Sequence, residues 1–219
     1  MIRTAALGCL LLIAVLPRPA PAAAGDPDWY GIDPVHTRVA FLVGHAGFSR
    51  SIATASGARG VLHFDAGAPL RSRVEVTLPA TGIDFGDADW NQRMLRRGFF
   101  NARRHPDLGF RSTSVEDLGG GRLRVTGELS VAGRTREVAL DTRFNAEGPN
   151  PVNRRRTVGF SATTTLDRRD FGMDAFPNAI GNEVELIIEV EAVRGRTSDQ
   201  IAPPDARREP ARAADEEDS

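Results

Sequence analysis

The stretch IDPVHTRVAFLVGHAGFS, residues 32–49, decides the fold of this chain. In it Val39, Phe41 and Val43 alternate with other residues, so a strand here turns one large apolar face in a single direction. Asp33-Pro34 predicts an extended lead into this strand, because proline fixes its own φ and disfavours the α region for the residue before it. Downstream segments repeat the alternation, which predicts an all-β protein.

About eight segments between Trp29 and Val193 carry the two-residue period of half-buried strands, and short turns join most of them. The last two segments run for ten or more residues, roughly 33 Å at ~3.3 Å per residue. Such long strands favour a closed antiparallel eight-stranded barrel over a two-sheet sandwich, whose strands usually have about five or six residues. Residues 50–59 are small and polar, which predicts a loop or a weak edge strand.

One short helix is predicted where the strand pattern stops, after Phe85. Asp87 or Asp89 can cap it, and Gly98 suits its end. Trp90 and Met94 stand four residues apart on one side, with Leu95 beside them. Two turns are not stable alone, so we expect the apolar side of this helix to dock at the mouth of the barrel.

The two ends of the chain differ from the rest. Residues 1–24 combine Arg3, an apolar run and the small residues before Gly25, which predicts a signal peptide cleaved near Ala24 and a periplasmic or secreted product. Cys9 is the one cysteine of the sequence, so the mature chain would hold no disulfide. We expect residues 25–194 to form the barrel domain and residues 195–219, rich in charge and proline, to form a disordered tail.

The charge pattern limits the kinds of partner. Removing Arg3 and Arg18 with the signal peptide leaves 26 of the 28 basic residues, all arginine, against 29 acidic residues, which argues against a nucleic-acid partner. A membrane-spanning barrel would need apolar outward faces and an aromatic girdle, whereas the polar strand faces here carry Glu and Arg. We therefore expect no stable membrane insertion. The sequence leaves open whether the protein forms a homodimer.

Three stretches together resemble the YceI-like family of secreted polyisoprenoid-binding barrels. They are IDPVHTRVAFLVGHAGFS at 32–49, the pattern ID…N…LR..FFNA..HP.L.F at 83–110, and LDRRDFGM followed by IGNEVELIIEVEA between 166 and 192. The resemblance implies an extended lipocalin-like barrel with a short capping helix. It also implies a long apolar ligand, such as a prenyl quinone, a prenyl phosphate or a fatty amide or acid, held for transport or storage. We predict no cofactor apart from such a bound lipid, and the absence of a nucleophile elbow or paired carboxylates argues against an enzyme.

Strand parity, the helix and the motif positions of the resemblance together nominate the side chains that would contact such a ligand. The predicted lipid-binding residues are Val39, Phe41, Val43, Phe48, Leu62, Phe64, Val74, Val76, Leu78, Phe85, Trp90, Met94, Leu95, Phe99, Phe110, Leu123, Val125, Leu140, Phe144, Phe160, Phe171, Phe176, Leu186 and Ile188. The predicted headgroup or rim contacts are His45, Asn91, Arg168 and Asp170. For Arg168 and Asp170, an ion pair that holds a loop is the competing interpretation.

Two other functions stay open. Asp33 with His36 or His45 could act as an acid/base pair in an unrecognised enzyme, although no nucleophile elbow accompanies them. The chain could instead be a stress or interaction protein with a filled barrel, working beside a membrane cytochrome or quinone system. No metal site is predicted, because the spacings of the four histidines match no zinc motif.

Overall fold

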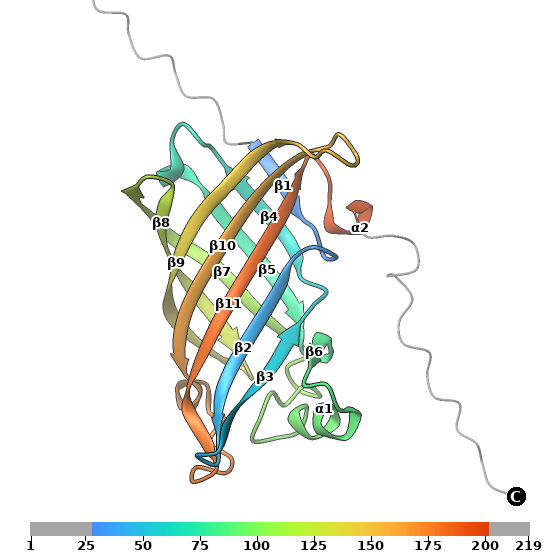
Figure 1. Ribbon diagram of the computed structural model, residues 1–219, viewed down its shortest axis with the longest axis vertical. Helices are drawn as coiled ribbons and strands as arrows, with labels where there is room; N and C mark the ends of the chain where they lie inside the picture. The colour runs from blue at the N-terminus through green and yellow to red at the C-terminus, as the bar shows by residue number, and fades with distance from the viewer. Residues whose placement is uncertain (1–27, 202–219) are drawn as a thin grey trace, which may run out of the picture.

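The structure is a computed structural model that describes residues 28–201 as an elongated barrel (Figure 1). Its strands are β1 (Asp28–Ile32), β2 (Arg38–His45), β3 (Ser49–Ala55), β4 (Arg59–Phe64), β5 (Arg73–Pro79), β6 (Ile83–Asp84), β7 (Asp107–Gly119), β8 (Arg122–Val131), β9 (Arg134–Pro149), β10 (Arg156–Asp167) and β11 (Ile180–Arg194). Its helices are α1 (Ala88–Met94), α2 (Ser198–Ile201) and three short 3₁₀ turns, Pro69–Arg71, Ala80–Gly82 and Arg168–Phe171.

Eight antiparallel strands close the barrel in the order β1-β4-β5-β7-β8-β9-β10-β11, and β11 returns to β1. The long strand β11 has two partners on the same side. Its end, Ala192 to Arg194, pairs with β1, and its earlier part, Ile180 to Glu189, pairs with β2. Strands β3 and β6 extend the sheet from β2. The predicted eight-stranded barrel with one short helix beside it is confirmed. Three strands, β2, β3 and β6, continue the sheet outside the closed ring, an extension that the sequence did not predict.

A turn separates β1 from β2, where the sequence predicted an extended lead. The Asp33 carboxylate accepts hydrogen bonds from the backbone N–H groups of Val35 at 2.8 Å and His36 at 3.1 Å. An aspartate that captures nearby N–H groups in this way stabilises a tight turn. The Thr37 hydroxyl then ties the turn to β11 through the Glu191 carbonyl at 3.2 Å. The prediction of an extended segment was therefore wrong at this point.

The polar segment after β2 forms an edge strand, so the second of the two predicted alternatives is the one observed. β3 pairs with β2 along its whole length, but it pairs with β6 only at Thr54 and Ala55. Ala53 and Ala55 are buried, whereas Ile52 points outward and is 62% exposed. The small inward residues let α1 and β6 approach this part of the sheet.

The described chain continues beyond Arg194, where the sequence predicted a disordered tail. The Ser198 hydroxyl accepts a hydrogen bond from the Gly60 N–H at 3.1 Å, and Arg59 pairs with Asp199. Residues 195–201 therefore pack on the outside of β4, and the ordered part extends past the predicted boundary. The predicted signal peptide, its cleavage site near Ala24 and residues 202–219 lie outside the described residues. Among residues 28–201, no helix is long and apolar enough to cross a membrane.

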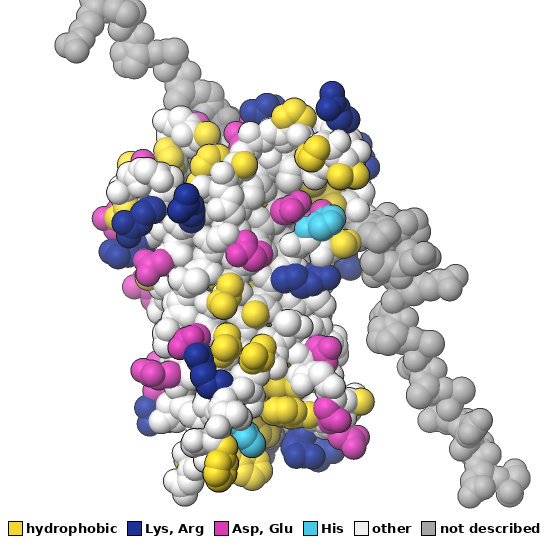
Figure 2. Space-filling view, in the orientation of Figure 1, with side chains coloured by type: hydrophobic (Ala, Val, Ile, Leu, Met, Phe, Trp, Pro, Cys, Tyr) yellow, Lys and Arg dark blue, Asp and Glu magenta, His cyan; other side chains and the backbone are white. Residues whose placement is uncertain are grey.

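Two apolar clusters occupy the two ends of the barrel interior. Tyr30, Phe64 and Phe160 centre the upper cluster, and Phe41, Phe100 and Phe171 centre the lower one. The outer wall is dotted with charged side chains of both signs (Figure 2). Helix α1 lies at the lower end, together with the β2–β3 hairpin and residues 172–179 (Figure 1). We call this end the mouth.

Candidate functional site

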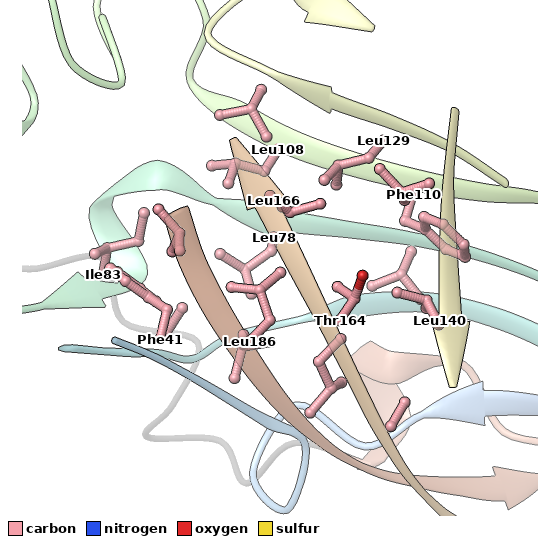
Figure 3. Close-up of a pocket in the computed structure, with 18 of the residues that line it drawn as sticks. Phe41, Leu78, Ile83, Leu108, Phe110, Leu129, Leu140, Thr164, Leu166 and Leu186 are labelled. Carbon is pink, nitrogen blue, oxygen red and sulfur yellow. The ribbon is translucent and has the colours of Figure 1, made fainter. Parts of the chain in front are cut away.

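A cavity of about 680 Å³ lies inside the barrel, and its wall is almost entirely apolar. Side chains from opposite strands converge on it, among them Phe41, Leu78, Leu140 and Leu186 (Figure 3). Several wall residues, including Val125 and Ile188, are only partly buried although they point inward. The side chains therefore leave the centre of the barrel unfilled. The volume falls within the roughly 300–1,000 Å³ typical of small-molecule sites.

Most of the residues nominated from the sequence lie in this wall. They are Val39, Phe41, Val43, Leu62, Phe64, Val74, Val76, Leu78, Phe85, Trp90, Met94, Phe99, Phe110, Leu123, Val125, Leu140, Phe160, Phe171, Phe176, Leu186 and Ile188. For the residues on strands the alternation is the reason, since one face of a closed barrel always points inward. Six of the nominated wall residues lie outside the strands: Phe85, Trp90, Met94, Phe99, Phe171 and Phe176. Whether a ligand contacts them stays a prediction.

Three nominated residues lie elsewhere. Phe48, at the tip of the β2–β3 hairpin, is 91% exposed and points away from the cavity. Leu95 packs against the lower cluster as the C-cap of α1. Phe144 stacks on Phe64, with ring centroids 5.3 Å apart, and helps to close the upper end. A hairpin tip, a helix end and a densely packed ring cluster are places where parity alone does not assign a side.

Further wall residues were not nominated. Leu108, Leu129, Val138, Leu166, Val184 and Val190 share the inward parity of their strands, so the same rule could have found them. Phe100, Met173 and Ala179 come from irregular segments at the mouth. No periodic signal marks residues of that kind, because the packing of distant segments alone places them at the cavity.

Aromatic rings connect the cavity with the surface at the mouth. Phe41 contacts Phe85 edge to face at 5.6 Å between ring centroids, and Phe85 stacks on Trp90 at 5.1 Å. Trp90 in turn lies 6.4 Å from the imidazole of His45, at the end of β2. His45 lines the cavity and is exposed, as are Arg93 and Phe176 at the same end. One exposed wall residue, Arg73, lies toward the other end.

Arg168 is 5% exposed and lines the cavity at the mouth. Its guanidinium donates hydrogen bonds to four backbone carbonyls, those of Gly181 at 2.8 Å, Ala175 and Ile180 at 3.0 Å, and Met173. Arg168 thus holds the loop before β11, as one interpretation of the sequence proposed, but through carbonyls and not through Asp170. The pKa of this guanidinium is lowered, mainly by burial, and the charge of the nearby Asp167 acts in the opposite direction.

The other two predicted rim residues do not line the cavity. The Asn91 side chain accepts a hydrogen bond from the Phe85 N–H at 2.7 Å and donates one to the Asp84 carboxylate at 2.8 Å. This use of both ends fixes α1 on β6 and lowers the pKa of Asp84. Asp170 is exposed in the turn that follows β10. Neither residue is in place to contact a molecule in the cavity.

Asp33 was considered for catalysis with either His36 or His45. Asp33 and His45 are separated by the length of β2, whereas Asp33 does pair with His36 at 2.9 Å, and this hydrogen bond raises the pKa of the imidazole. Ligand atoms of Asp33, His36 and Glu191 lie within 4.8 Å of one another, a grouping that could hold a metal ion and that the spacing of the histidines does not reveal. His36 is 61% exposed and lies outside the cavity wall, so this cluster does not act on a molecule in the cavity.

Comparisons with known proteins agree with this architecture. The YceI-like domain family matches residues 30–192 of the chain. A UPF0312 protein of Azotobacter vinelandii is 35% identical over 159 residues, which cover 73% of this chain and 82% of that protein. A UPF0312 protein of Shewanella oneidensis is 33% identical over 177 residues, which cover 80% of this chain and 92% of the relative.

Solved structures share the fold at lower identity. BcnA of Burkholderia cenocepacia superposes with a TM-score of 0.67 at 18% identity, covering 74% of this chain and 99% of BcnA. A polyisoprenoid binding domain from Saccharophagus degradans superposes with a TM-score of 0.57 at 12% identity, covering 75% of this chain and 98% of that domain. The family match spans most of the described barrel, and this chain therefore belongs to the YceI-like domain family.

Proposed function

We propose that this protein binds one long-chain apolar molecule, of isoprenoid or acyl type, inside the barrel and carries or stores it outside the cytoplasm. The unfilled apolar cavity of about 680 Å³ is the observation that carries the proposal. An empty apolar space of this size loses dispersion contacts on all sides, and an apolar ligand restores them. The alternative function, a stress or interaction protein with a filled barrel, has no comparable observation in its favour.

The polar groups of the cavity suit a ligand with a single polar end. His45, Arg93 and Arg168 contribute to the wall at the mouth, whereas the ring cluster of Phe64, Phe144 and Phe160 and one charged wall residue, Arg73, lie toward the opposite end. A prenyl quinone or prenyl phosphate has one polar group on a long apolar chain. The name of the Saccharophagus degradans domain, a polyisoprenoid binding domain, points to the same class of ligand. The predicted signal peptide supports export to the periplasm or the medium.

Native mass spectrometry of protein purified without detergent tests this proposal. We expect a fraction of the protein to carry additional mass that organic extraction releases as a long-chain lipid. A long-chain fluorescent probe should bind the extracted protein, and a prenyl alcohol should displace it. The proposal fails if the protein carries no lipid and the probe does not bind.

A further inference from the structure

The mouth carries two apolar side chains that are largely exposed, although one of them, Phe176, also lines the cavity. Phe48 is 91% exposed at the tip of the β2–β3 hairpin, and Phe176 is 61% exposed in the segment before β11. The two segments touch, because the Ala46 N–H donates a hydrogen bond to the Ala179 carbonyl at 2.6 Å. Exposed aromatic residues that lie together mark interaction sites more often than isolated ones do. Apolar side chains also gather at the lower tip in the space-filling view (Figure 2).

The backbone conformation of Phe176 strengthens this argument. Its φ is +51°, a value that bulky residues rarely adopt, whereas glycine or asparagine would fit there with less strain. The Phe176 carbonyl accepts hydrogen bonds from the N–H groups of Ala179 and Ile180, and its ring stacks on Phe99 at 6.2 Å. The position thus holds an aromatic side chain outward in a conformation that this residue type does not favour.

An arginine-rich segment that includes α1 lies at the same end of the barrel (Figure 1). Residues 85–106 contain Arg93, Arg96, Arg97, Arg103 and Arg104, all exposed, against Asp87 and Asp89. None of the five forms an ion pair within residues 28–201, whereas some arginines on the strands do, as Arg50 does with Glu185 at 2.7 Å. This segment contacts one of the two rings, since Phe99 stacks on Phe176, and its Trp90 lies beside His45 at the start of the hairpin that carries Phe48. The mouth therefore combines protruding aromatic rings with unpaired positive charge.

We propose that the mouth docks reversibly on a bilayer surface that contains anionic lipid. The protruding rings would enter the region between headgroups and acyl chains, and the arginines would contact the anionic headgroups. Such docking is distinct from insertion, which the described helices do not support. It would place the open end of the cavity against the source or destination of a lipid. That use rests on the proposed function, although the docking itself does not.

The opposite end of the barrel supplies a matched control. Val152 is 90% exposed there, between β9 and β10, with Arg154 and Arg155 beside it. It thus combines apolar exposure with positive charge, as the mouth does. The ring cluster of Phe64, Phe144 and Phe160 lies at that end, which carries no pair of exposed aromatic rings comparable to Phe48 and Phe176 within the described residues. If the protein docks through the mouth, Val152 should contribute nothing to vesicle binding.

Flotation of the full mature protein with vesicles tests the proposal. Vesicles of phosphatidylcholine and phosphatidylglycerol in equal parts should bind the protein, and added salt should weaken binding by screening the charges. Phe48→Ser should weaken binding roughly tenfold or more, because burial of a phenylalanine ring is lost. Arg96→Glu combined with Arg97→Glu should weaken it by at least about tenfold. Val152→Ser should bind like the wild type.

Probe binding in solution keeps this test separate from the proposed function. Phe48 does not line the cavity, so Phe48→Ser should retain full affinity for the long-chain probe. The docking proposal is overturned if the wild type does not bind these vesicles, or if it binds pure phosphatidylcholine vesicles equally well. It is also overturned if Val152→Ser loses as much binding as Phe48→Ser. If the probe does not bind the wild type, the proposed binding of a ligand in the cavity is overturned instead.

Discussion

Glu147 connects the top of the barrel to the protein's response to acid. Its carboxylate accepts hydrogen bonds from the buried Tyr30 hydroxyl at 2.6 Å and from Arg156 at 2.7 Å. Burial alone would raise the pKa of Glu147, but these two hydrogen bonds outweigh burial and lower it below 4.5. For Tyr30, burial and the same carboxylate raise the pKa to about 12. The ionised Glu147 and the neutral Tyr30 therefore stabilise the folded state together.

Replacing Glu147 by glutamine should make this contribution visible. A carboxylate with a lowered folded pKa stabilises the fold above its unfolded pKa, and this stability is lost as the pH falls through the folded value. Wild type should thus melt higher than Glu147→Gln near neutral pH, and the difference should shrink as the pH drops below about 4.5. Thermal melting from pH 3 to pH 7, a range of about four units around that value, checks this. A constant difference would contradict the assignment.

Arg168 is expected to stabilise the mouth through its hydrogen bonds to the backbone. Arg168→Met would keep much of the volume but leave the carbonyls of residues 173, 175, 180 and 181 without their donor. Buried acceptors without partners cost about 1–3 kcal/mol each, less where water can reach them, so we expect a loss of about 3 kcal/mol. Urea unfolding of Arg168→Met and wild type measures this loss of unfolding free energy. Arg168→Lys should lose less, and equal stability of Arg168→Met and wild type would refute this role.

Helix α1 acts as a docked element whose apolar side faces the lower cluster. Met94 and Leu95 pack against that cluster, and Asp87 caps the helix by accepting a hydrogen bond from the Trp90 N–H at 2.8 Å. Leu95→Asp should destabilise the protein by about 1–3 kcal/mol, because an unpaired carboxylate would be placed against apolar side chains. It should also weaken probe retention, since α1 supplies wall residues. Arg96→Glu, on the exposed side, should leave the melting temperature unchanged. Equal losses in both variants would place the apolar side elsewhere.

The regular elements could be predicted from the sequence because each strand in a closed barrel has one inside and one outside face. Phe41 and Val43 follow this rule. Phe48 was nominated from the resemblance and not from the alternation, and it lies beyond the turn at Ala46-Gly47, exposed and outside the cavity wall. Asp33 shows a second limit, since its side chain replaces the backbone partners that an extended segment would need. Phe100 and Met173 reach the cavity only because distant segments meet at the mouth. The periodicity within one segment does not predict which distant segments pack against each other.

The barrel as a unit can be tested by filling it. Val76 on β5 and Ile188 on β11 both line the cavity, whereas their neighbours Glu75 and Glu189 are exposed. Val76→Trp and Ile188→Trp should occupy volume that a lipid chain would use, and we expect probe affinity to fall at least about tenfold. Melting temperatures should stay close to wild type, because the added atoms enter open space.

A barrel with a packed centre would respond differently to the same substitutions. Forcing extra atoms into a filled core costs about 1–3 kcal/mol, so Val76→Trp and Ile188→Trp would then lower the melting temperature by several degrees. Glu75→Trp and Glu189→Trp serve as controls, since their side chains face solvent and should leave both probe binding and melting unchanged. Probe binding that survives both inward substitutions, or that disappears equally in the outward controls, would mean that the ligand does not occupy the barrel interior. Loss of binding with retained stability, confined to the inward pair, is the result that an unfilled apolar barrel predicts.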